Sequence, residues 1–149
     1  MSAADMYGRF FLDTNILIYA FDQSAPEKQR TAAQLIRDAV GTGMGMISTQ
    51  VVQEFLHASR RKFKQPMTLA ERQHHLRVVL RPLCQYFPAI SSYEQALLVS
   101  EETGYTFYDA LIVTAAIESG CDTLLTEDLQ HGRVIQSVRV VNPFLSPAG

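Results

Sequence analysis

Short apolar segments alternate with longer amphipathic stretches along this chain. The short segments have the length and composition of buried strands. They are Arg9–Leu12, Met44–Ile47, Phe87–Ile90, Thr123–Leu125 and Val138–Val141. In the stretches between them, apolar residues recur every three or four positions, which is the period of a helix. Because strands separated by helices favour a parallel sheet with crossover connections, the pattern predicts an α/β fold with a mostly parallel sheet.

Capping signals mark the ends of the predicted helices. The polar residues Asp13–Asn15 suit a turn and an N-cap before the apolar segment Ile16–Phe21. Pro26 opens the next helix, and Gly41 and Gly43 end it. Further helices are expected after Ser48 or Thr49, from the capping box Thr68–Glu71 to about Leu80, from Ser92 to Thr103, and from Asp109 or Ala110 to Ile117.

The chain has 149 residues, of which 47% are hydrophobic, so it can form one buried core. No linker rich in Pro, Gly or Ser divides it, and we expect one domain spanning residues 1–149. Cys84 and Cys121 match neither a disulfide framework nor a zinc site, so both are expected to be buried free thiols. The longest uncharged run, Ala39–Gln53, is too short and too rich in glycine to cross a bilayer. We therefore expect a soluble cytoplasmic protein with no membrane partner.

Charged residues are segregated along the chain. Thirteen Lys and Arg residues against fifteen Asp and Glu residues give a formal net charge of −2, which argues against a strongly basic, non-specific nucleic-acid binder. The segment Pro82–Asp128 contains eight acids and neither Lys nor Arg. Such segregation predicts opposed surfaces or a site that gathers carboxylates. The basic residues that precede this segment are Arg60, Arg61, Lys62, Lys64, Arg72, Arg77 and Arg81.

Four acids occupy positions where predicted strands end or helices begin. Asp13 and Asp128 follow strands, Asp109 lies at a helix start, and Glu54 lies one turn into a helix. Singly, each has an ordinary explanation as a helix cap, a turn residue or a solvated acid near a helix N-terminus. Functional groups nevertheless collect at the carboxyl edge of a parallel sheet, and separate capping roles do not require four acids there. Their joint placement therefore favours a functional site.

Clustered carboxylates repel one another and are stable only when protons or cations neutralise them. Oxygen ligands select Mg²⁺ or Mn²⁺, and a magnesium ion held by a few carboxylates is completed by water and substrate phosphate. The pattern therefore predicts phosphoryl chemistry. No phosphate-binding glycine loop and no Ser or Cys nucleophile motif offers another mechanism. The histidines, expected at the surface or in a loop, are His57, His74, His75 and His131.

Four segments resemble, in order, the motifs of PIN-domain nucleases, in particular the VapC-type ribonuclease toxins of toxin–antitoxin pairs. They are Phe11–Leu17, Gln50–Phe55, Tyr108–Ile112 and Leu124–Leu129. The resemblance extends from Phe10 to about Pro143. It implies a PIN-like three-layer α/β/α sandwich, a bivalent metal ion, hydrolysis of RNA, a homodimer and inhibition by a small antitoxin protein.

The resulting hypothesis is a Mg²⁺- or Mn²⁺-dependent endoribonuclease. Its catalytic residues and metal ligands would be Asp13, Glu54, Asp109 and Asp128. Its supporting residues would be Thr14, Asn15, Thr126 and Glu127, with Glu127 also an alternative to Asp128 as the fourth acid. The basic run would either hold the RNA backbone or simply be a solvated helix end whose charges favour the helix dipole. This run comprises Arg60, Arg61, Lys62 and Lys64.

Three alternatives stay open at this point. The chain could be a housekeeping PIN-type RNA-processing nuclease instead of a toxin. It could be a Mg²⁺-dependent phosphatase or receiver-like domain, which also places acids at the carboxyl edge of a parallel sheet but forms a covalent aspartyl phosphate. A non-catalytic binding protein is the third alternative, and the presence of all four acids counts against it.

Overall fold

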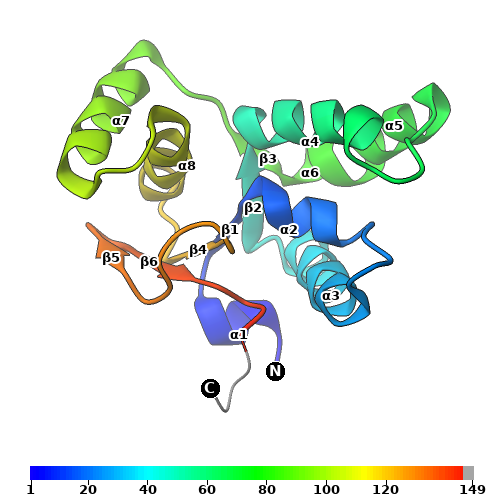
Figure 1. Cartoon of the computed structure of the whole chain (residues 1–149). Helices are drawn as coiled ribbons and strands as arrows, with labels where there is room; N and C mark the ends of the chain where they lie inside the picture. Colours follow the sequence, from blue (N-terminus) through cyan, green and yellow to red (C-terminus); the bar gives the residue numbers. More distant parts are fainter. Residues whose placement is uncertain (146–149) are drawn as a thin grey trace.

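The computed structural model describes residues 1–145, in which six strands form one sheet with helices on both sides (Figure 1). The strand order is β3-β2-β1-β4-β6-β5. The strands are β1 (Phe10–Leu12), β2 (Gly45–Ser48), β3 (Cys84–Tyr86), β4 (Thr123–Leu125), β5 (Val134–Ile135) and β6 (Val138–Val141). The helices are α1 (Ala3–Tyr7), α2 (Thr14–Tyr19), α3 (Pro26–Thr42), α4 (Thr49–Arg61), α5 (Leu69–His75), α6 (Arg81–Leu83), α7 (Ile90–Thr103) and α8 (Phe107–Glu118), with the π-helical segment η1 (Leu76–Leu80) between α5 and α6.

The sheet is parallel except at one edge. Strand β1 pairs in parallel with both β2 and β4, with Phe10 opposite Gly45 on one side and Thr123 on the other. Only β5 runs antiparallel, to β6. The predicted α/β fold with a mostly parallel sheet is therefore confirmed. Because β1, β2 and β4 run in the same direction, the segments that follow them emerge at one edge of the sheet.

The core surrounds the central strands. All three residues of β1 are fully buried, as are Leu124 and Leu125 of β4. Helices α7 and α8 lie on one side of the strands and α2, α3 and α4 on the other, as Figure 1 shows. Coverage on both faces explains why these strands are continuously apolar and do not alternate between apolar and polar residues.

Gly45 is required where β2 meets its neighbours. A Cβ atom at this position would lie 2.3 Å from the Cβ of Ala39 and 2.6 Å from Cε2 of Phe10. Any larger residue would force α3 or β1 away from β2. The glycine thus allows close packing of helix α3 on the sheet, beside the strand that carries Asp13 at its end.

The predicted strand Phe87–Ile90 is wrong. The strand in this region is β3, which pairs with β2 through Cys84 and Tyr86, whereas Phe87 and Ile90 are 70% and 80% exposed. Pro88 has no N–H group to donate to a strand ladder, which explains why pairing stops before it. Helix α7 begins at Ile90, two residues earlier than expected.

Other boundaries differ where a cap or a tertiary contact decides them. Thr106 caps α8, so this helix begins at Phe107 and Asp109 lies inside its first turn instead of capping it. The short elements α1 and β5 were not expected from the sequence. Both cysteines are free as predicted, although Cys84 is only partly buried. None of the helices within residues 1–145 is long and apolar enough to cross a membrane.

Candidate functional site

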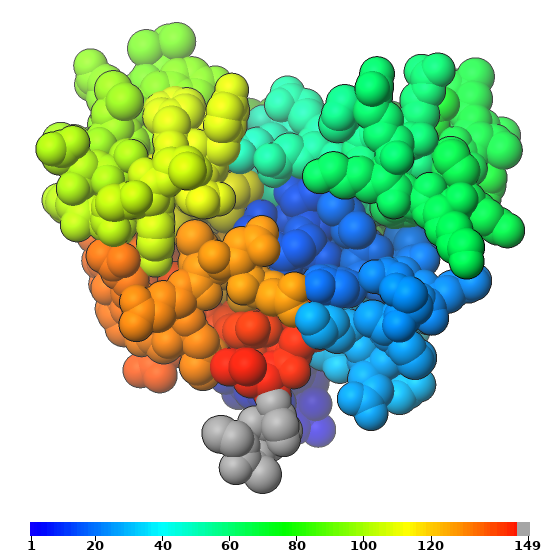
Figure 2. Space-filling model, in the orientation of Figure 1, coloured from blue at the N-terminus to red at the C-terminus, as the bar shows by residue number. Residues whose placement is uncertain are grey.

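The four predicted acids line one cavity of about 370 Å³. Asp13 follows β1, Asp128 lies in the loop after β4, Glu54 lies on α4, and Asp109 lies on α8. The surface in Figure 2 is hollowed between the lobe formed by α7 and α8 and the lobe formed by α4 and α5. The other lining residues are Thr14, Asn15, Ile18, Gln50, His57, Ala58, Lys62, Tyr108 and Ile112.

Asp13 is both a helix cap and the most buried acid of this cavity. Its Oδ1 atom accepts a hydrogen bond of 2.7 Å from the Thr14 N–H and caps α2. Its Oδ2 atom accepts hydrogen bonds from Thr126 Oγ1 at 2.8 Å and from Asn15 Nδ2 at 3.3 Å. Only 7% of the residue is exposed. The capping and functional interpretations of Asp13 are therefore compatible.

The surroundings of Asp13 disfavour its negative charge. Burial raises the pKa of this carboxyl to about 7, the hydrogen bonds from Thr126 and Thr14 oppose that rise, and the nearby Asp128 and Glu54 carboxylates add to it. Near neutral pH the Asp13 carboxyl is therefore protonated in part of the molecules, and a bound cation would favour its ionised form. A divalent metal ion is such a cation, and the carboxylate and hydroxyl oxygens here are the donors that Mg²⁺ and Mn²⁺ prefer.

Asn15 and Thr126 connect the acids at the sheet edge. Asn15 Nδ2 lies 3.1 Å from both Thr126 Oγ1 and Asp128 Oδ2, and Thr126 Oγ1 also accepts a hydrogen bond of 3.0 Å from the Asp128 N–H. Thr126 is completely buried. These contacts bring the Asp13 and Asp128 carboxylates to the same amide nitrogen.

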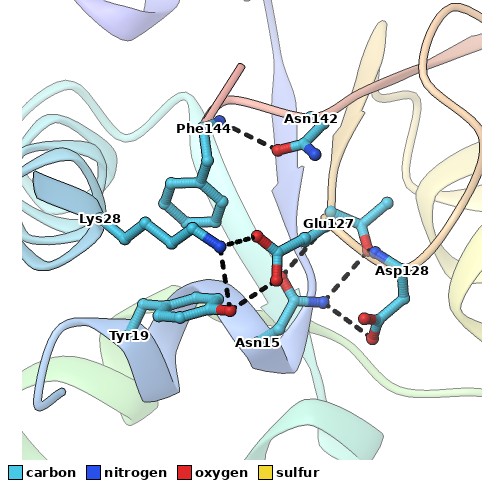
Figure 3. Close-up of polar contacts among 8 residues, drawn as sticks. Asn15, Tyr19, Lys28, Glu127, Asp128, Asn142 and Phe144 are labelled. Carbon is cyan, nitrogen blue, oxygen red and sulfur yellow. Dashed lines mark hydrogen bonds and ion pairs between the residues drawn. The ribbon is translucent and has the colours of Figure 1, made fainter. Parts of the chain in front are cut away.

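Glu127 faces away from this group. Its carboxylate accepts a hydrogen bond of 2.5 Å from the Tyr19 hydroxyl and forms an ion pair with Lys28 (Figure 3). Asp128, not Glu127, lines the cavity. The sequence could not reveal this because Lys28 lies 99 residues away and no motif marks it or Tyr19.

The two acids on helices are held less firmly than Asp13. Glu54 is exposed, and its Oε1 atom accepts a hydrogen bond of 2.8 Å from Thr14 Oγ1. Asp109 is partly exposed, and its backbone N–H bonds to the Thr106 cap. Gln50 Nε2 donates to the Tyr108 carbonyl oxygen at 3.1 Å and so joins the starts of α4 and α8 across the cavity. Within residues 1–145, no three acidic, histidine or cysteine side chains form a ready-made metal cage.

The basic run lies at the end of α4 and just beyond it. All four of its predicted RNA-binding residues are exposed, but only Lys62 lines the cavity. His57, one turn earlier on the same helix, also lines it and was expected only as a surface residue. The members of the run are Arg60, Arg61, Lys62 and Lys64.

The sequence from residue 10 to residue 135 matches the family model of the PIN domain, so the chain belongs to the PIN domain family. No curated protein matches its sequence.

Three solved structures share this fold at 20% sequence identity. A toxin–antitoxin complex from Klebsiella pneumoniae has a TM-score of 0.63, with 90% of this chain and 97% of that chain covered. VapBC2 from Rickettsia felis, bound to a DNA fragment from its promoter, has a TM-score of 0.56, with 88% and 96% covered. VapC20 from Mycobacterium tuberculosis, a toxin that cleaves the sarcin-ricin loop, has a TM-score of 0.53, with 77% and 86% covered. The chain therefore shares its fold with these three structures.

Proposed function

We propose that residues 1–149 form a single PIN-like nuclease domain that acts as a metal-dependent endoribonuclease. The observation that carries the proposal is the buried Asp13 carboxyl, which shares one cavity with three further acids. Membership of the PIN domain family supports it, because PIN-domain nucleases generally use divalent metal ions. The metal is Mg²⁺ or Mn²⁺, in keeping with an all-oxygen donor set.

Asp13 and Asp128 would hold the metal ion at the sheet edge, and Glu54 and Asp109 would complete the site with water and substrate. When bound, the ion activates water and stabilises the negative charge of a phosphodiester undergoing hydrolysis. The protein's own part is positioning. Asn15 and Thr126 orient the first two carboxylates through the hydrogen bonds described above. The two polar side chains thus keep the Asp13 and Asp128 carboxylates close together although the two negative charges repel each other.

The walls of the cavity suit a single strand of RNA. Lys62 and the neighbouring basic side chains of α4 would neutralise backbone phosphates. Tyr108 lines the cavity and is 67% exposed, so its ring offers a surface on which a base can stack. In this proposal Lys62 on one wall neutralises the RNA phosphates, and Tyr108 on the other wall stacks on a base.

We further propose that the protein is the toxin of a type II toxin–antitoxin pair and forms a cytoplasmic homodimer inhibited by a small antitoxin. One of the similar structures is described as a toxin–antitoxin complex and another as VapBC2 bound to promoter DNA, which supports an antitoxin partner. The alternative is a housekeeping PIN-type RNA-processing nuclease. Co-expression with the product of the adjacent reading frame distinguishes the two, because an antitoxin would form a stable complex and abolish cleavage.

The central test is cleavage of single-stranded RNA with Mn²⁺ or with EDTA. We expect internal cleavage only with the metal, and a loss of about a hundredfold or more in the Asp109→Asn variant. Glu102→Gln is the matched control, because Glu102 is an exposed acid on α7 that does not line the cavity.

Full cleavage by Asp109→Asn would overturn the catalytic assignment. A phosphatase or receiver-like domain would instead acquire an acid-labile phosphate from a phosphate donor, and we expect none.

A further inference from the structure

Glu127 and Asp128 are adjacent in the chain but contact different parts of the molecule. Figure 3 shows their carboxylates on opposite sides of the Asn15 amide. Asp128 accepts a hydrogen bond from Asn15 Nδ2, whereas Glu127 is bound by Tyr19 and Lys28. Since either acid could have faced the cavity, the contacts of Glu127 decide which one does.

Lys28 and Tyr19 bind the Glu127 carboxylate, and the Phe144 ring packs beside both of them. We call these three side chains the Lys28 clamp. The Lys28 ammonium lies 3.3 Å from the Tyr19 hydroxyl, 4.8 Å from the Tyr19 ring centre and 5.6 Å from the Phe144 ring centre. The two rings pack edge to face, with centres 4.9 Å apart. The clamp therefore combines an ion pair with cation–π contacts from α2, α3 and the segment after β6.

Glu127 also connects the clamp to the acids. Its backbone N–H donates a hydrogen bond of 3.2 Å to Asn15 Oδ1. With that oxygen bonded to Glu127, the amide nitrogen of Asn15 faces the other way, toward Asp13 and Asp128. One continuous set of contacts thus runs from Lys28 through Glu127 and Asn15 to both carboxylates.

The clamp contributes little to overall stability. The side chains of Lys28 and Glu127 are 39% and 26% exposed, and an ion pair this accessible to water adds little to the free energy of unfolding. Partial burial disfavours the charged Glu127 carboxylate, but the hydrogen bonds from Lys28 and Tyr19 prevail and lower its pKa. The main consequence of the clamp is therefore local: it fixes the loop that carries Asp128 and keeps a further negative charge away from Asp13.

We propose that Lys28, acting through Glu127, is a positioning residue of the candidate metal site. By holding Glu127 it sets the Asn15 amide and the Asp128 carboxylate in the arrangement that binds the metal ion. This inference rests on the proposed function, because it concerns how that site is held. Partners that orient metal ligands from outside the ligand set have effects on metal affinity of about ten- to a hundredfold.

The test is calorimetric titration of the metal-free protein with Mn²⁺ alone. Lys28→Met removes the charge but keeps the length of the side chain, and we expect roughly tenfold weaker Mn²⁺ binding with faster amide hydrogen exchange at Asp128. Lys28→Arg is expected to retain wild-type affinity because it preserves the ion pair. Arg30→Met is the matched control, since Arg30 is an exposed basic residue on the same helix and lies outside the clamp.

The outcomes separate this inference from the proposed function. Wild-type Mn²⁺ affinity in Lys28→Met, with RNA cleavage intact, would overturn the inference alone, whereas absence of Mn²⁺ binding by the wild-type protein would overturn both. Should Lys28→Met fail to fold, Tyr19→Phe removes only the hydroxyl bonded to Glu127, and we expect a loss of about threefold. Unchanged affinity in that variant would equally contradict the role of the clamp.

Discussion

The two halves of the acid-lined cavity are built differently. At the sheet edge, Asp13 and Asp128 share hydrogen bonds with Asn15 and Thr126, and Asp13 is almost fully buried. On the helical walls, the Glu54 side chain is more exposed and bonds to Thr14. Asp13 is therefore fixed before any ligand arrives, whereas the exposed Glu54 side chain can adjust to one.

In the proposed function, this difference would separate metal binding from the accommodation of RNA. A metal ion needs ligands that are already in place, because ordering them costs conformational entropy at the moment of binding. An RNA strand needs walls that can accommodate different bases. We infer that the sheet edge sets metal affinity and that α4 and α8 set the response to substrate.

The largest effect is expected in the dependence of stability on pH. The folded protein keeps a proton on Asp13 up to a pKa of about 7, whereas the unfolded chain loses it near pH 4. The contribution of Asp13 to stability is therefore fully present below pH 4 and is lost as pH rises to 7, by up to about 4 kcal/mol. Mn²⁺ should restore stability at pH 8 more than at pH 5, because it binds the ionised form. Urea unfolding at the two pH values measures both effects.

Asp13→Asn is the control for this prediction, since it removes the titrating group. The difference in pH dependence between wild type and variant isolates Asp13 from the other acids. Identical pH profiles for the two proteins would show that the sheet-edge half is not strained by a buried charge.

A smaller effect is expected from removing one hydroxyl in each half. Thr126→Val deletes a fully buried hydroxyl that donates to Asp13 and accepts from Asn15 and the Asp128 N–H, and should lower the free energy of unfolding by about 2 kcal/mol. Thr14→Val deletes a single hydrogen bond to the exposed Glu54 and should cost less than about 1 kcal/mol. Chemical denaturation compares the two variants, and equal losses would contradict the contrast between the halves.

The smallest effect is expected on the outer part of the helical wall. Replacing Arg60, Arg61 and Lys62 by Ala should weaken RNA binding roughly tenfold at 0.1 M salt and reduce the slope of log affinity against log salt by up to about 2. Filter binding at several salt concentrations measures this slope. The matched control replaces Arg30 and Arg37, which lie on α3 outside the cavity. If the triple substitution leaves the slope of log affinity against log salt unchanged, the basic run is a solvated helix end that does not contact RNA.

Much of the fold and the candidate acids could be predicted from local signals. The short, largely apolar segments Phe10–Leu12 and Thr123–Leu125 fit strands that are covered on both faces. The capping box at Thr68 and the N-cap at Ser48 follow from short-range hydrogen bonding and were recognisable for that reason. Around Phe87 hydropathy misled, because β3 pairs with β2 only as far as Tyr86 and Pro88 has no N–H group to continue the ladder.

The sequence by itself determined the alternation of helices with the central strands, the presence of an acid after β1 and after β4, and the motif pattern of a PIN domain, because these features depend on residues close together in the chain. Only the tertiary structure decided that Asp128 and not Glu127 faces the cavity. That choice depends on Lys28 and Tyr19, which meet Glu127 across about a hundred residues of chain. Neither residue carries a local signal of its role. The directions in which Glu127 and Asp128 point are set by residues that contact them only once the sheet has formed.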